Sequence, residues 1–190
     1  SSVNGEGKSY VATNLAISMA LLGKKVALVG LDIRKPMLAN YLNLPSQGCL
    51  TSYLSDDSYT LEDTIVTSSI KNLDILPAGV IPPNPSELLQ SERLDVLFTE
   101  LRKRYDCVVI DSAPVALVSD TFLLNRVADM TIYVTRANYT TFDLIDFLNQ
   151  THEQQRLPKM VAVLNGVDAK KIGYGYGYGY GHQTTKKKWW

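Results

Sequence analysis

The feature that most constrains this chain is a glycine-containing segment near its start. Residues 2–9 read Ser-Val-Asn-Gly-Glu-Gly-Lys-Ser, which matches the phosphate-binding loop G-x-x-x-x-G-K-[S/T] except that Ser2 replaces its first glycine. Successive backbone N–H groups of such a loop, with the positive end of the helix that follows, form a cradle for phosphate oxygens. The segment therefore predicts a nucleotide-binding protein.

Residue type indicates what each position of the loop does. Lys8 can reach the outer phosphates, and the Ser9 hydroxyl can bind Mg²⁺. Gly5 and Gly7 permit backbone torsions and a close approach that a side chain would block. The residues expected to contact the nucleotide in and after the loop are Asn4, Gly5, Glu6, Gly7, Lys8, Ser9 and Tyr10.

The segments after the loop alternate between helix and strand patterns. Residues 8–22 have apolar side chains at helical spacing (Val11, Leu15, Met19 and Leu22), and Gly23 is a natural helix stop. A helix is also predicted over 85–105, with Asn84 as its N-cap and Glu87 as a capping-box acid. Short apolar runs predict strands at 26–29, 73–76, 107–110, 131–134 and 161–164.

This alternation predicts an α/β fold of the P-loop NTPase type, in which a parallel sheet is covered by helices on both faces. Such a fold also needs a strand that feeds the loop from its N-terminal side. That strand is absent from the sequence, so the chain is expected to be a fragment of a longer protein.

Composition sets broad limits on the function. A chain of 190 residues can form one domain with a sizeable core. The formal net charge is zero, so nothing global indicates a nucleic-acid partner. Two cysteines, Cys49 and Cys107, are too few for a disulfide framework and are expected to be reduced thiols.

Two aspartates follow predicted strands. Asp32 comes three residues after the strand at 26–29, and Asp111 directly follows the one at 107–110. Ligands in parallel α/β sheets bind at the carboxyl ends of the strands, and a carboxylate there can hold Mg²⁺ through water. The alternative role for each aspartate is a turn former or a helix cap. Their combination with Lys8 and Ser9 at one sheet edge favours the metal site.

The C-terminal segment differs from the rest. Residues 173–181 alternate glycine and tyrosine, which suits neither a stable helix nor a well-packed strand. The chain is therefore divided into a catalytic domain, 1–166, and a flexible tail with a basic end, 167–190. The tail is either a low-complexity linker or an array of phosphate acceptors, which would be Tyr174, Tyr176, Tyr178 and Tyr180.

Together these features resemble the bacterial tyrosine kinases, P-loop autokinases that regulate capsule and exopolysaccharide export. The resemblance rests on the loop, on 28–36, on 105–114 and on the tyrosine tail. It also rests on Leu-Pro-Ala-Gly at 76–79, which runs into Pro-Pro-Asn-Pro-Ser-Glu-Leu-Leu at 82–89.

The resemblance implies a set of site residues and cofactors. ATP and Mg²⁺ would be bound, with Lys8 on phosphate, and Ser9, Asp32 and Asp111 around the metal. The catalytic residues would be Lys8, Asp32 and Asp111. Asn165, at the end of the last strand, matches a position that contacts adenine in related ATPases; its alternative role is a turn residue.

It also implies partners and a location. Subunits would form a ring in which each site phosphorylates the tail of a neighbour, and a cognate tyrosine phosphatase would reverse the reaction. A transmembrane activator, separate or fused as a chain-length-determinant domain, would place the protein at the cytoplasmic face of the inner membrane. No nucleic-acid partner is implied.

One departure from the family pattern leaves the catalytic base open. Gly30 stands where the first of two aspartates in the second acidic motif is expected. Asp32 could take that role, or the reaction could need little base help. Two other functions also fit the loop: a nucleotide-switched ATPase of the MinD/ParA type, and a non-catalytic nucleotide-binding scaffold.

Overall fold

The computed structural model describes residues 1–42 and 49–168. The elements in chain order are α1 (Lys8–Leu21), β1 (Val26–Gly30), α2 (Leu38–Leu42), α3 (Leu50–Ser55), β2 (Val66–Thr67), β3 (Leu73–Leu76), α4 (Pro85–Gln90), α5 (Glu92–Arg104), β4 (Cys107–Asp111), the 3₁₀ helix η1 (Ser119–Arg126), β5 (Thr131–Arg136), α6 (Phe142–Glu153) and β6 (Met160–Asn165). All five predicted strands are confirmed.

The strands form two sheets. The larger has the order β2-β3-β1-β4, in which β1 runs parallel to both β3 and β4, and only the short β2 is antiparallel. The smaller consists of the parallel pair β5 and β6. Successive residues of β1 enter different cores: Ala27 and Val29 pack in a cluster with α3, α4 and α5, whereas Val26 and Leu28 pack with α1. Helices therefore cover both faces of the larger sheet, as the sequence predicts.

Two helix predictions need correction. The helix expected over 85–105 is broken at Ser91, whose backbone is extended (φ −63°, ψ 146°) and whose hydroxyl donates to the carbonyl of Leu88. The Asn84 side chain donates to the Glu87 carboxylate instead of capping the backbone. In α1 the expected apolar face does not extend to Leu22, which is 78% exposed, because the helix packs through small residues such as Ala16 and Ala20.

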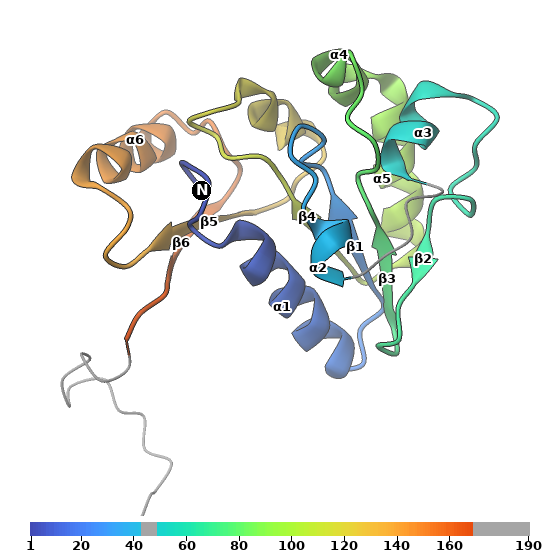
Figure 1. The fold of residues 1–190 in the computed structure, drawn as a ribbon, viewed down its shortest axis with the longest axis horizontal. Coiled ribbons are helices and arrows are strands. Elements are labelled where there is room, and N and C mark those ends of the chain that lie inside the picture. Colours follow the sequence, from blue (N-terminus) through green and yellow to red (C-terminus); the bar gives the residue numbers. More distant parts are fainter. Residues whose placement is uncertain (43–48, 169–190) are drawn as a thin grey trace, which may run out of the picture.

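A cavity of about 650 Å³ separates the two sheets. All of β4 and residues 131–134 of β5 line it, and no strand among the described residues lies between them. Both strands end beside the phosphate-binding loop, β4 at Asp111 and β5 at Arg136, so they run in the same direction. The N-terminus also lies beside β5 (Figure 1). In the described part of the chain, no helix combines the length and the apolar character needed to span a bilayer.

The geometry of this cavity yields a stability prediction. Six apolar, β-branched residues added before Ser1 are expected to supply the strand that leads into the loop and to fill the cavity between β4 and β5. The melting temperature should then rise by about 4–8 °C, since a net gain of ~2 kcal/mol shifts a domain of this size by that amount. A matched extension with two of the six residues replaced by lysine should give no gain. Thermal unfolding checks the pair, and equal melting temperatures would contradict the prediction.

Candidate nucleotide and magnesium site

The phosphate-binding loop takes a conformation that requires its glycines. Gly5 and Gly7 have φ values of 85° and 96°, in the left-handed region that residues with a Cβ rarely adopt. Gly7 is the N-cap of α1, so the helix begins directly at Lys8. The unpaired amides and the positive end of a 14-residue helix therefore face the position of a bound phosphate.

Parallel pairing brings the two predicted acids to this loop. Gly30 of β1 pairs with Asp111 of β4, and just beyond the pair the N–H groups of Leu31 and Asp32 both donate to the Asp111 carbonyl, at 2.7 and 3.1 Å. Lys8 lies close enough for its charge to act on the Asp111 carboxylate. The structure thus brings Lys8, Asp32 and Asp111 together at one sheet edge.

The Asp111 carboxyl is in an unusual environment. The residue is 3% exposed, and its Oδ1 has no hydrogen-bond partner among the described residues. Burial raises the pKa of this carboxyl; a hydrogen bond with the Ser9 hydroxyl and the positive charge of Lys8 offset part of the rise. An unpartnered buried carboxylate oxygen is costly unless a ligand satisfies it.

Mg²⁺ fits this donor set. The cation is bound in phosphoryl-transfer sites through one or two carboxylates, a hydroxyl and substrate phosphates, and it keeps several waters. Asp111, Ser9 and Asp32 offer these groups, although Asp32 also uses its Oδ1 to accept the N–H of Lys35 at 2.9 Å. Within the described ranges no three His, Cys, Asp or Glu side chains form a group that could hold a metal by themselves.

The opposite side of the loop contacts the smaller sheet through residues that the sequence analysis missed. Arg136, the last residue of β5, donates to the Gly5 carbonyl at 2.8 Å, and the Tyr139 hydroxyl donates to the Asn4 carbonyl at 2.9 Å. The only sequence signal for them is their position just after a predicted strand. Asn165, expected to contact adenine, uses its side-chain N–H to bond the Glu6 carbonyl at 3.0 Å.

Glu6 and Tyr10, both expected to contact the nucleotide, differ from each other in how exposed their side chains are. The Glu6 side chain is fully buried; it accepts the N–H of Val3 at 3.0 Å and the hydroxyl of Thr140 at 2.6 Å. Only the backbone of Glu6 is therefore in position to meet phosphate. Tyr10, in the first turn of α1, is 63% exposed.

An ion pair between the exposed Arg34 and the buried Asp120 supports the loop that carries Asp32. Arg34 donates to the carboxylate of Asp120 at 2.9 and 2.5 Å and to the Ser86 hydroxyl at 3.0 Å. Asp120 is 8% exposed, and its other oxygen accepts the same hydroxyl at 3.0 Å. The segments at 28–36 and 82–89, which appear as separate motifs in the sequence, are thereby joined at one point. Asp120 was not identified from the sequence.

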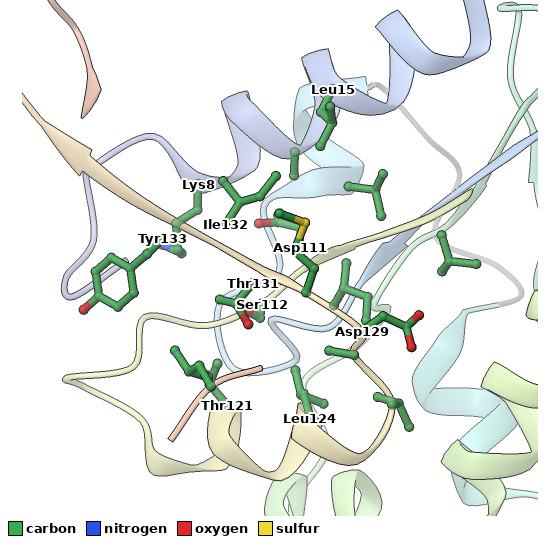
Figure 2. Close-up of a pocket in the computed structure, with 18 of the residues that line it drawn as sticks. Lys8, Leu15, Asp111, Ser112, Thr121, Leu124, Asp129, Thr131, Ile132 and Tyr133 are labelled. Carbon is green, nitrogen blue, oxygen red and sulfur yellow. The ribbon is translucent and has the colours of Figure 1, made fainter. Parts of the chain in front are cut away.

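The cavity between the sheets meets this site at one end. Lys8, Asp111 and Ser112 lie there, and Leu15 of α1 and Leu124 of η1 are among the apolar residues that line other parts of the cavity (Figure 2). Phosphate chemistry suits only the end with the polar groups. The apolar part of the cavity lies between the side chains of the two sheets.

The predicted phosphate acceptors cannot be placed. Tyr174, Tyr176, Tyr178 and Tyr180 lie outside the described residues, as does most of the predicted tail. The division at residue 166 therefore stays a prediction.

Comparison with known proteins identifies the family. Residues 3–160 match the AAA domain family. Over 136 residues the chain is 41% identical to the tyrosine-protein kinase YwqD of Bacillus subtilis, a match that covers 72% of this chain and 57% of that relative. The kinase domain of the Escherichia coli tyrosine kinase ETK superposes with a TM-score of 0.82 at 30% identity, covering 94% of this chain and 69% of that domain. The chain belongs to the bacterial tyrosine-protein kinase family.

A more distant likeness shows how widely the fold is shared. The septum site-determining protein MinD of Pyrococcus horikoshii, solved with Mg-ADP, superposes with a TM-score of 0.69 over 86% of this chain and 68% of that one. The identity is 22%, so this likeness concerns the fold alone. It agrees with the P-loop NTPase-like parallel sheet seen here.

The buried Asp111 carboxyl yields a prediction on pH dependence. Its pKa is raised in the folded state, so its charge costs stability that grows as pH rises from about 3.8 through the folded pKa. Asp111→Asn is expected to stabilise the nucleotide-free protein by roughly 1 kcal/mol at pH 8 and by less at pH 4. Urea unfolding at both pH values checks this. The same variant should lose the extra stability that Mg-ADP gives the native protein; an unchanged gain would remove Asp111 from the metal site.

Proposed function

We propose that this chain is the catalytic part of an ATP-dependent protein tyrosine autokinase. The observation that carries the proposal is the convergence of Lys8, Ser9, Asp32 and Asp111 on one sheet edge, in a chain of this family that ends in clustered tyrosines. The reaction is transfer of the γ-phosphoryl group of ATP to the hydroxyl of Tyr174, Tyr176, Tyr178 or Tyr180.

The described residues supply positioning and charge. The loop amides and Lys8 hold the phosphates, and Lys8 offsets the negative charge that spreads over the transferred group. Ser9 and Asp111, with Asp32, would hold Mg²⁺, and the bound cation would supply neutralisation of the phosphate charge. The phenol oxygen forms the new P–O bond as the bond to the β-phosphate oxygen breaks, and the phenol proton leaves to a base or to water.

Position 30 is not a source of that base. A Cβ built on Gly30 would lie 3.1 Å from the backbone nitrogen of Ala78 and 3.3 Å from a methyl group of Leu38, tighter than most real Cβ contacts. Asp32 is partly exposed, and one of its oxygens is not used by the Lys35 amide, so this carboxylate is the candidate base. A phenol has a pKa of ~10, so a carboxylate here would raise the rate without being essential.

The arrangement of subunits is part of the proposal. A short tail that follows the last strand is not expected to reach its own site, which favours transfer between subunits of a homo-oligomeric ring. Each phosphate adds about −1.5 to −2 charges, so phosphorylated tails would repel one another and loosen the ring. By family resemblance, a transmembrane activator places the ring at the cytoplasmic face of the membrane, where it regulates capsule or exopolysaccharide export.

Mass spectrometry tests the function directly. After incubation with Mg-ATP, phosphate is expected on the tail tyrosines of the native protein and at less than about 1% of that level in Lys8→Ala, because loss of one oxyanion-type contact lowers rates by 10²- to 10³-fold. The assay should include any membrane activator found with the protein. ATP consumption with unmodified tyrosines would overturn the autokinase and favour a switch ATPase.

A matched pair of variants at position 30 isolates the contribution of a catalytic base. Gly30→Ala and Gly30→Asp both add a Cβ against the Ala78 backbone and should lower the free energy of unfolding by a similar amount, about 1–3 kcal/mol. The aspartate variant is expected to phosphorylate the tail faster than the alanine variant, since it restores a carboxylate. Equal rates would show that proton removal at this position does not limit the reaction.

A further inference from the structure

Three consecutive carbonyl groups of the phosphate-binding loop are held by side chains from the smaller sheet and from the turn after β5. Tyr139 bonds the carbonyl of Asn4, Arg136 bonds that of Gly5, and Asn165 bonds that of Glu6. The donor–acceptor distances are 2.9, 2.8 and 3.0 Å. We call these three side chains the carbonyl clamp. The larger sheet, which carries both acids, contributes none of them.

The planar trans peptide gives these contacts a functional consequence. In each peptide unit the C=O of one residue and the N–H of the next point in opposite directions. Because the clamp holds the carbonyls of residues 4, 5 and 6, the amides of Gly5, Glu6 and Gly7 are turned away from the clamp. These are the amides that a phosphate-binding loop of this spacing presents to its anion.

We propose that Arg136, Tyr139 and Asn165 are positioning residues that orient the phosphate-binding amides before nucleotide arrives. This inference rests on the proposed nucleotide-binding function and assigns the rigidity of its cradle to the smaller sheet. A glycine-rich loop has many accessible conformations, so fixing three of its peptide planes in advance removes an ordering cost from ligand binding.

The closeness of the contact supports this role. A Cβ at Gly5 would lie 2.8 Å from the Tyr139 hydroxyl, and a Cβ at Gly7 would overlap the side-chain nitrogen of Asn165. The glycines thus allow the clamp to touch the loop backbone, besides permitting its torsions. The clamp and the loop meet without intervening space.

The clamp is itself held in place. The Thr140 hydroxyl accepts the Arg136 N–H at 2.8 Å and donates to the buried Glu6 carboxylate, which ties the turn after β5 to the loop. The Arg136 guanidinium lies 5.4 Å from the centre of the Tyr139 ring. The N–H of Ala137 donates to the Asn165 carbonyl at 2.9 Å, so the two strand ends that carry the clamp are joined.

This arrangement predicts a particular kinetic signature. The oriented amides hold the phosphates of the bound nucleotide in the ground state as well as during transfer, so loosening them should raise KM and leave kcat nearly unchanged. Each single loss of a clamp hydrogen bond should weaken binding by about 3- to 10-fold. Lys8→Ala differs, because it lowers kcat.

The test uses Mg-pyrophosphate, which has phosphates and no base, beside Mg-ADP. Tyr139→Phe, Arg136→Met and Asn165→Ala are titrated with each probe by calorimetry. Tyr59→Phe is the control tyrosine variant, because Tyr59 lies between α3 and β2, is 38% exposed and has its carbonyl bonded by Arg93 of α5. Both dissociation constants are expected to rise by the same factor in each clamp variant and to stay at the native value in the control. Melting temperatures without ligand separate an effect on binding from general unfolding.

The outcomes distinguish this inference from the proposed function. Native protein that binds neither probe would overturn nucleotide binding itself, whereas clamp variants that bind both probes like the native protein would overturn the clamp alone. If Asn165→Ala weakens Mg-ADP and leaves Mg-pyrophosphate unchanged, Asn165 acts on adenine and is not a positioning residue. If a variant proves too unstable, Tyr139→Phe, which removes a single hydroxyl at a half-exposed position, still decides the question.

Discussion

The phosphate-binding loop links two sheets that, in the described part of the chain, form no hydrogen-bonded pairs with each other. On one side, the pairing of β1 with β4 brings Asp32 and Asp111 to it. On the other, Arg136 and Asn165 come from the parallel ends of β5 and β6, which pair directly at these two residues. Because the site needs both sheets, its geometry depends on how firmly the loop holds them together, and the loop contacts matter for stability as well as for binding.

Function and stability oppose each other at Asp111. A buried carboxylate oxygen without a partner, and a pKa raised by burial, cost the ligand-free protein stability. The residue fits a site in which Mg²⁺, bound together with the nucleotide, would become the partner of this oxygen. Arg34 and Asp120 show the contrasting case: there the buried carboxylate is satisfied on both oxygens by protein groups, so the contact holds the Asp32 loop whether or not a ligand is bound.

Much of the fold could be predicted because its strands are short apolar runs and the site acids follow them within three residues. What escaped prediction depends on contacts distant in sequence. The break at Ser91 and the packing of α1 through Ala16 and Ala20 depend on the cores around them, which periodicity alone does not describe. Arg136 and Tyr139 have no motif of their own, because their role arises only where β5 ends beside the loop.

Ser2, which replaces the first glycine of the loop consensus, is also explained by a contact distant in sequence. Ser2 is fully buried and its φ is not in the left-handed region, so the backbone there does not require glycine. Its hydroxyl lies 2.8 Å from that of Tyr133, a fully buried residue of β5 that needs a polar partner. A glycine would leave the phenol of Tyr133 without this partner. In this chain the residue that weakens the sequence motif therefore adds a further connection between the loop and the smaller sheet.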